Sequence, residues 1–170
     1  MTYFRTLPSK MNSVQFLDQY ADVYEHSPWV AERAWAAGIS EKHNEIEVLA
    51  GLMARIVLEA DETEQRKLIE AHPDLAGKAA IEGGLTAAST SEQEGAGLDN
   101  CTAEEYAAFQ AYNDAYKKKF GFPFIKAVKN SNRFEILADF KVRLENEIQE
   151  ELKTAIAEIN KIARFRLADL

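Results

Sequence analysis

The spacing of the apolar residues constrains the fold of this chain more than any other feature. Near the end of the chain they recur at steps of three and four, with charged residues opposite: Ile148, Leu152, Ile156, Ile159 and Ile162. This period places one apolar stripe along an α-helix, whereas a half-buried strand alternates with a period of two. Helical spacing covers most of the chain, and no run of strands alternates by twos. The pattern predicts an all-α fold, a single-domain helical bundle of about seven to nine helices over residues 1–170.

Capping signals divide this pattern into helices. A short polar side chain followed three residues later by glutamate predicts a helix start, as at Asp61–Glu64 and Thr102–Glu105. Ser13 is the expected cap of the first helix. A longer helix is expected from about His43 to Ala60. From Asn132 onward, helix is expected almost to the end of the chain.

Composition and charge exclude several classes of protein. With 46% hydrophobic and 28% charged residues, the chain is typical of a folded globular domain. Its net charge of −8 argues against nucleic acid or an anionic membrane surface as a main partner. Cys101 has no partner for an internal disulfide, no charged-then-apolar leader opens the chain, and no apolar run approaches the ~20 residues of a bilayer span. We therefore expect a cytoplasmic protein that does not enter membranes.

The segment from Ala71 to Asp99 departs from the helical pattern. It holds five of the eight glycines, a His-Pro dipeptide and a run of small hydroxylated residues. Such composition suits irregular backbone between helices, and a long loop-rich stretch in a compact domain usually has a function. The segment also contains His72 and Glu92, which a turn at Gly83-Gly84 allows to approach each other. We predict that these two side chains meet in a pocket.

His72 is the first candidate for chemistry. Because Pro73 follows it, its backbone is biased away from the helical region, and we expect it at a loop-to-helix junction with Pro73 in the first helical turn. A carboxylate such as Glu92 would raise the pKa of His72 and hold its proton for transfer. A hydrogen-bonded histidine without any chemical role is the alternative. The other two histidines, His26 and His43, lie at expected helix edges among charged residues, where we expect both to be solvated.

The run from Ser89 to Glu94 is the second candidate. Three pairs of residues in it have the spacing of a capping box, and one helix start uses only one such pair. A cap alone therefore accounts for part of the run and leaves several hydrogen-bonding side chains beside the glycines. The sequence keeps both interpretations open, a helix cap and a binding site.

The stretch from Phe120 to Val128 is the third candidate. Gly121 and Pro123 interrupt regular helix, while the aromatic and aliphatic residues around them are expected to be buried. Backbone N–H and C=O groups in such a stretch are not committed to a helix, so they are available to a ligand. A hydrophobic turn that only fills the core is the alternative.

Motifs for metals and cofactors are missing from the sequence. It has no His-Glu-x-x-His, no pair of cysteines and no acidic ladder that would indicate a metal site. It also has no glycine-rich phosphate loop after a strand. We expect no metal and no organic cofactor, so that any chemistry is proton transfer or polarisation by side chains.

Four motifs occur in an order and at spacings that match a known family. They are His72-Pro73-Asp74-Leu75, Ser89-x-x-Glu92-Gln93 leading to Ala96-Gly97-Leu98, Phe120-Gly121-Phe122-Pro123-Phe124, and Ile162-Ala163-x-x-Arg166-Leu167. Over most of its length the chain resembles the 2-oxo-4-hydroxy-4-carboxy-5-ureidoimidazoline (OHCU) decarboxylases of urate breakdown. The resemblance implies an all-helical fold, usually a homodimer, and conversion of OHCU to (S)-allantoin and carbon dioxide without a cofactor.

The resemblance also implies roles for single residues. His72 is similar to the catalytic acid/base of the family and Glu92 to its essential partner, while Arg166 resembles an arginine near the substrate. The sequence leaves open whether His72 donates a proton or polarises the substrate hydroxyl. Further positions resemble substrate contacts: Pro73, Ser89, Thr90, Ser91, Glu92, Gln93, Phe124, Ile125, Lys126, Ala127 and Val128.

Two other functions fit parts of the pattern. A non-catalytic helical module that binds another protein would have the same amphipathic helices and acidic charge. Another cofactor-free lyase or isomerase, acting on a small ureido or imidazoline compound, would need a similar set of polar groups. The first alternative leaves unexplained why His72, the hydroxylated run and the broken aromatic stretch occur together.

Overall fold

The computed structural model describes residues 1–77, 80 and 82–170, and their regular structure is helical. These residues form eight α-helices, so the predicted all-α fold of seven to nine helices is confirmed. β-type pairing within them is a single isolated bridge between Tyr3 and Glu45. None of the described helices is long and apolar enough to cross a membrane.

Contacts divide the chain into two compact units. The first unit comprises residues 1–71 and 159–170, and the second comprises residues 72–158. The predicted site residues from His72 to Val128 therefore lie in the second unit, whereas Arg166 lies in the first. That residues 1–170 form one domain stays a prediction.

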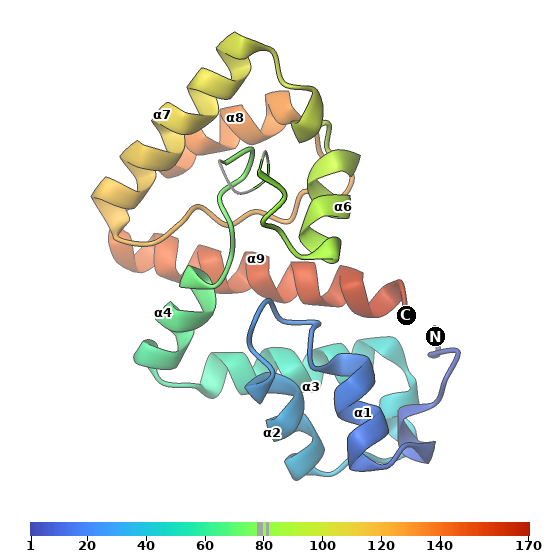
Figure 1. The fold of residues 1–170 in the computed structure, drawn as a ribbon. Coiled ribbons are helices and arrows are strands. Elements are labelled where there is room, and N and C mark those ends of the chain that lie inside the picture. The colour runs from blue at the N-terminus through green and yellow to red at the C-terminus, as the bar shows by residue number, and fades with distance from the viewer. Residues whose placement is uncertain (78–79, 81) are drawn as a thin grey trace. The chain divides into compact units, whose positions relative to one another are not determined.

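The first unit contains four complete helices and the end of a fifth (Figure 1). They are α1 (Ser13–Tyr20), α2 (Trp29–Ala37), α3 (Ile46–Glu59), α4 (Glu62–Glu70) and the C-terminal part of α9 (Ile148–Ala168), with 3-10 turns at Pro8–Lys10 and Glu41–Asn44. The expected cap of the first helix is wrong by one residue. Asn12 accepts a hydrogen bond from the Gln15 N–H, while the Gln15 side chain accepts one from the Asn12 N–H, so Ser13 is already helical.

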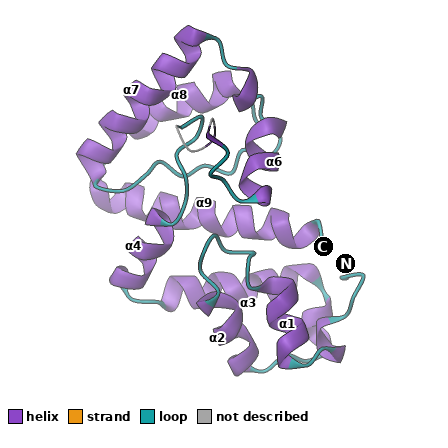
Figure 2. Cartoon of the chain, in the orientation of Figure 1, coloured by secondary structure: helices purple, strands orange, loops and turns teal. Residues whose placement is uncertain are grey.

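The described residues of the second unit form three complete helices and the start of α9. They are α6 (Ala87–Gly95), α7 (Ala103–Phe120) and α8 (Arg133–Arg143), with a 3-10 turn at Leu98–Asn100. Figure 2 shows the two loops that matter for the site, one after α4 and one between α7 and α8. The predicted caps at Asp61 and Thr102 are confirmed, since each side chain accepts from the N–H three residues on.

Helix α8 ends earlier than the sequence pattern predicts. Helix was expected from Asn132 almost to the end of the chain, but four residues between Arg143 and Ile148 are not helical. Within this break, the Asn146 side chain donates to Glu151 Oε2 at 3.0 Å. A side-chain hydrogen bond of this kind, between residues five apart, has no signature in helical periodicity.

Aromatic side chains fill the core of the second unit. The Phe124 ring stacks on Phe140 with centroids 3.8 Å apart, and Tyr116 meets Phe124 edge-on at 5.3 Å. The predicted burial of the broken aromatic stretch is confirmed for Phe120, Phe122, Phe124, Ile125 and Val128. The stretch is thus irregular in backbone but anchored by its side chains, which gives its peptide groups fixed positions.

His43 is buried, so the expectation that it is solvated is wrong. It lies in the 3-10 turn before α3, and its Nδ1 accepts a hydrogen bond from the Ser40 N–H at 2.9 Å. Helix α3 begins only at Ile46, because the turn uses the preceding residues to close this local bond. His26, in contrast, has a side chain that is 67% exposed.

Burial of His43 predicts a pH-dependent stability. Burial, and then the neighbouring Lys42 charge, lower the pKa of His43 in the folded protein. The unfolded chain then binds the proton more tightly, so the free energy of unfolding should fall as the pH drops below about 6.5. His43→Asn, whose side-chain oxygen can replace the Nδ1 acceptor, should show a weaker fall. Urea unfolding at pH values above and below this range measures the difference; equal slopes for both proteins would contradict the prediction.

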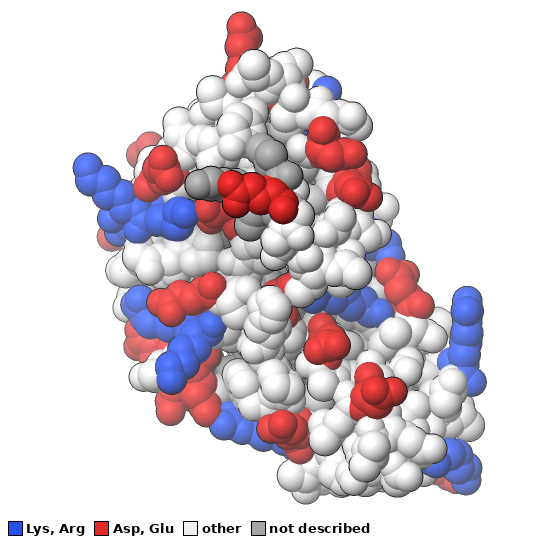
Figure 3. All heavy atoms as spheres, in the orientation of Figure 1, with Lys and Arg blue, Asp and Glu red and all other residues white. Residues whose placement is uncertain are grey.

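Charged side chains are interspersed on the surface. On the face drawn in Figure 3, acidic groups are spread among uncharged ones, with basic groups between them and near the edges. No continuous basic area is seen there among the described residues.

Candidate functional site

The loop that carries His72 follows directly on α4. Helix α4 ends at Glu70, and residues 72–77 form turns without helix, so the expectation that Pro73 starts a helix is wrong. His72 itself is 8% exposed and is therefore buried. It lies in this loop and not at the start of a helix.

Gln93 joins this loop to α6. Its side-chain oxygen accepts a hydrogen bond from the Ala76 N–H at 3.0 Å, and its amide nitrogen donates to the Asp74 carbonyl at 3.3 Å. Gln93 is 5% exposed, and its bond to Ala76 is buried while its bond to Asp74 is partly buried. The helix that carries Glu92 and the loop that carries His72 are thereby held together.

Helix α7 binds the same loop through three side chains. The Gln110 amide donates to the Ala76 carbonyl at 2.8 Å, the Asn113 amide donates to the Leu75 carbonyl at 3.0 Å, and Lys117 pairs with Asp74 at 2.6 Å. None of these three residues was predicted from the sequence. Their signal is their spacing of three and four, which places polar groups on the side of α7 that also buries Phe109 and Tyr116.

Backbone conformation inside the loop is unusual. Ala76 is buried and has a φ of 49°, a left-handed conformation that costs a residue with a side chain about 1–2 kcal/mol. A Cβ atom at Gly77 would lie 2.7 Å from the Cβ of Asp74, so glycine is required there. Strain of this kind persists only where surrounding contacts enforce it, and it is often found at functional sites.

Loss of the Gln93 side chain should loosen the loop. Gln93→Ala leaves the buried Ala76 N–H without its acceptor, and the free energy of unfolding should fall by about 1–3 kcal/mol. Hydrogen exchange of the Ala76 amide should accelerate in parallel. Glu94→Ala, one residue along on the exposed side of α6, is the matched control and should change neither quantity. Unchanged exchange of the Ala76 amide in Gln93→Ala would contradict the role of this bond.

Helix α6 carries the hydroxylated run, and its cap lies before the run. Thr86 caps the helix by accepting from the Ser89 N–H, so the expectation that the run itself supplies the cap is wrong. Ser89 and Gln93 are buried, Glu92 is half-buried, and Thr90 and Ser91 are exposed. The residues at steps of three and four thus face inward together. That Glu92 meets His72 in a pocket stays a prediction.

A cavity of about 490 Å³ borders the loop of residues 72–77 at Ala76. Ala76 and Gln93 contribute to its wall, together with residues from the start of α7 such as Tyr106. His72, Glu92 and the Phe124–Val128 stretch are not among the described residues that line it. Gln93 therefore lines this cavity and also belongs to the candidate site. The predicted catalytic pair, His72 and Glu92, does not line the cavity.

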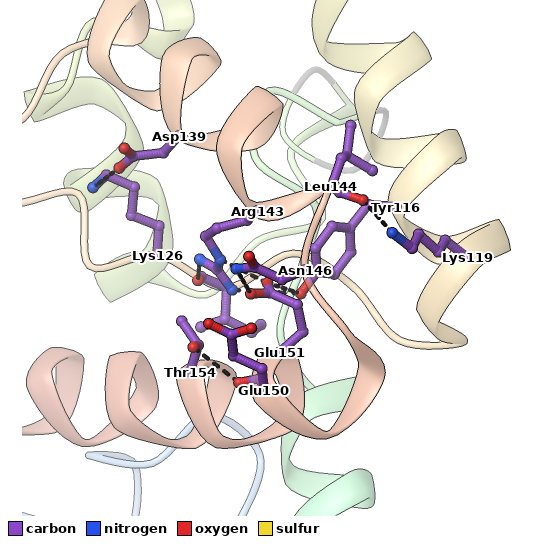
Figure 4. A network of polar contacts seen from close by, with 11 residues as sticks. Tyr116, Lys119, Lys126, Asp139, Arg143, Leu144, Asn146, Glu150, Glu151 and Thr154 are labelled. Carbon is purple, nitrogen blue, oxygen red and sulfur yellow. Dashed lines mark hydrogen bonds and ion pairs between the residues drawn. The ribbon is translucent and has the colours of Figure 1, made fainter.

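The loop between α7 and α8 supplies the other predicted contacts. Gly121, with a φ of 80°, ends α7 as predicted, and the chain then runs without regular structure to Asn132. Lys126 is half-buried, and its ammonium group pairs with Asp139 of α8 (Figure 4). Among the described residues, the N–H groups of Phe124–Val128 donate to no backbone carbonyl. That these groups contact a ligand stays a prediction.

Arg166 lies in the first unit and is held there by the loop between α1 and α2. Its Nη2 donates to Glu25 Oε2 at 2.8 Å, and its Nη1 donates to the Val23 carbonyl at 3.3 Å. Glu25 is 2% exposed, so this is a buried ion pair. A contact between Arg166 and substrate stays a prediction.

The described residues contain no group of three or more His, Cys, Asp or Glu side chains arranged to hold a metal ion. Of the predicted groups for proton transfer, His72 is buried and Glu92 is half-buried.

Comparisons with known proteins identify similar chains. The model of the OHCU decarboxylase family matches residues 9–168. An OHCU decarboxylase of Haloferax volcanii is 37% identical over 95% of this chain and 92% of its own length. An OHCU decarboxylase of Xenopus laevis is 35% identical over 95% of this chain and 91% of its own length. A crystal structure of OHCU decarboxylase in the presence of (S)-allantoin has a TM-score of 0.70 at 26% identity, over 86% of this chain and 93% of that one. A crystal structure of (S)-allantoin synthase has a TM-score of 0.72 at 29% identity over 94% of this chain, which spans 50% of that protein.

Proposed function

This chain belongs to the OHCU decarboxylase family, and we propose that it converts OHCU to (S)-allantoin and carbon dioxide as a cofactor-independent carboxy-lyase. The family match over residues 9–168 is the observation that carries the proposal. The relatives from Haloferax volcanii and Xenopus laevis, which are matched over nearly their whole length, support it.

The reaction requires electron density to be accepted and a proton to be delivered to one face. When the bond to the carboxyl carbon breaks, its electron pair passes into the ring, where the adjoining C=N group takes it up. The hydroxyl-bearing carbon then becomes a carbonyl, and a proton arrives on the carbon that carries the ureido group. A site that offers fixed donors to the developing charge and excludes water lowers this barrier.

His72 is the proposed acid/base and Glu92 its partner. His72 is buried, and its loop is bound at Ala76 by Gln93 of α6 and Gln110 of α7, which supports an ordered imidazole. A histidine fixed in this way can deliver a proton to one face of the intermediate, which gives one enantiomer. Polarisation of the substrate hydroxyl by His72 is the other role compatible with this position.

The remaining contacts are proposed from the same family resemblance. Peptide N–H groups of the Phe124–Val128 stretch are proposed donors to the substrate oxygens, since they donate to no backbone carbonyl among the described residues. The inward side of α6 from Ser89 to Gln93, with Pro73 beside it, is the proposed wall of the site. Arg166 is proposed to contribute a positive charge near the substrate.

The assembly and location of the protein are also proposals. We propose a homodimer in the cytoplasm that works on a small molecule. Light scattering of the purified protein measures its mass in solution against the 19.1 kDa of one chain. A mass of one chain at micromolar concentration would contradict the dimer.

Circular dichroism at allantoin wavelengths tests the activity directly. Urate is treated with urate oxidase and hydroxyisourate hydrolase to generate OHCU, and the purified protein is added. Rapid appearance of the (S)-allantoin signal is expected. Slow formation of racemic product, at the rate of spontaneous decay, would show that the chain is not this decarboxylase and would favour a non-catalytic role.

A further inference from the structure

A buried polar network (Figure 4) is bonded to the Phe124–Val128 stretch at the Ile125 carbonyl. At its centre is Glu151 of α9, which is fully buried. Its carboxylate accepts hydrogen bonds from Tyr116 OH at 2.6 Å, Arg143 Nε at 2.7 Å and Asn146 Nδ2 at 3.0 Å. Burial and the bond to Glu151 raise the pKa of Tyr116, which therefore stays a donor. A buried carboxylate bound this completely fixes the position of its partners.

Arg143 connects this network to the stretch in two ways. Its Nη1 donates to the Ile125 carbonyl at 2.5 Å, and its guanidinium carbon lies 4.2 Å from the centroid of the Phe124 ring. The planar guanidinium directs Nε at Glu151 and Nη1 at Ile125 simultaneously, which a lysine ammonium cannot do in the same geometry. The position of the Ile125 peptide group therefore depends on Arg143.

The orientation of one peptide group follows from this bond. Described peptide bonds are all trans, so the Ile125 carbonyl and the Lys126 N–H point in opposite directions. Arg143 binds the Ile125 carbonyl, so this carbonyl points toward the polar network. The Lys126 N–H therefore points away from the network. A cation on the carbonyl also polarises the peptide group and strengthens the opposed N–H as a donor.

We propose that Arg143, held by Glu151, is a positioning residue that aims the Lys126 N–H at an oxygen of the ureidoimidazoline substrate. This role rests on the proposed function and adds to it the side chain that orients one proposed donor, the Lys126 N–H. A donor fixed before the reaction stabilises developing negative charge without reorganising, so its loss lowers kcat more than it raises KM. Neither Arg143 nor Glu151 needs to touch the substrate for this effect.

Arg143→Lys tests the proposal, because it keeps the positive charge and removes the planar guanidinium that binds Glu151 and the Ile125 carbonyl at once. We expect kcat for (S)-allantoin formation to fall by about 10²-fold, as on removal of one fixed donor, with a smaller change in KM. The ¹⁵N–¹H resonance of Lys126 should also move, because the peptide group loses the guanidinium. The matched control is Arg133→Lys, which alters an arginine of α8 paired with Glu105 of α7 in the same unit. It should leave kcat and the Lys126 resonance unchanged.

The outcomes separate this inference from the proposed function. If the unaltered protein forms no (S)-allantoin, the proposed function fails, and the substrate role of Lys126 fails with it. If the unaltered protein is active and Arg143→Lys keeps both its kcat and its Lys126 resonance, only the positioning role of Arg143 is overturned.

Glu151→Gln is the second variant, for the case in which Arg143→Lys does not fold. It retains the size of the side chain and an acceptor for Tyr116 but removes the charge that holds Arg143. It should lower kcat in the same direction and shift the same resonance. A folded Glu151→Gln protein with unaltered kcat would overturn the proposal.

Discussion

His72→Asn is expected to lower kcat for (S)-allantoin formation by about 10²–10⁴-fold, the usual contribution of a general acid or base. Asparagine retains a polar side chain at a buried position but cannot donate and recover a proton near neutral pH. Product that still forms should approach a racemic mixture, because no group delivers the proton to one face. Circular dichroism measures the enantiomer and a coupled absorbance assay measures the total rate.

Two controls distinguish loss of chemistry from loss of structure. His26→Asn replaces an exposed histidine whose φ is 46°, a backbone conformation that asparagine tolerates well, and should leave rate and enantiomer unchanged. Far-ultraviolet circular dichroism and urea unfolding should show that His72→Asn is folded. A folded His72→Asn protein that yields (S)-allantoin alone at the original rate would refute the role of His72.

Glu151→Ala is expected to lower the free energy of unfolding by about 3–5 kcal/mol, because it leaves the buried Arg143 charge without its partner. The cost arises mainly from the uncompensated cation, which is 8% exposed, and Tyr116 loses its acceptor as well. Urea unfolding followed by near-ultraviolet circular dichroism reports on the aromatic core that surrounds the network.

A double variant separates charge from packing in this network. Arg143→Met with Glu151→Leu removes both charges and fills much of the space with apolar atoms, so it should recover a large part of the stability lost in Glu151→Ala. Glu47→Ala, which breaks an ion pair with Arg164 in which both side chains are more than half exposed, should cause no measurable change. If the double variant is as unstable as Glu151→Ala, an unpaired charge is not the cause.

Local sequence signals predicted the helices well where capping is local. Thr102 and Glu105 form the expected capping box, and Gly121 ends α7 in the left-handed conformation. The errors occur where a hydrogen bond that helical periodicity does not encode decides the boundary. Helix α6 begins before the hydroxylated run because Thr86 caps it, and α8 ends where Asn146 turns toward Glu151.

Family motifs in the sequence predicted the family, which the family match over residues 9–168 and the similar chains confirm. The roles of the individual site residues His72, Glu92 and Arg166 remain predictions, and the His72→Asn variant tests the first of them. The residues that hold the loops in place were not predicted. Gln110, Asn113 and Arg143 donate hydrogen bonds to backbone carbonyls far away in sequence. Such partners cannot be predicted from local sequence spacing.

The helical class, the capping signals and the motifs could be predicted from the amino-acid sequence, because each depends on side chains only a few residues apart. Which buried polar groups meet depends on the packing of the folded chain. Gln93 binds the backbone 17 residues before it, and Arg143 binds the Ile125 carbonyl 18 residues before it. A buried peptide group must find a partner wherever the fold supplies one, and only the packing of helices around the loops specifies that partner.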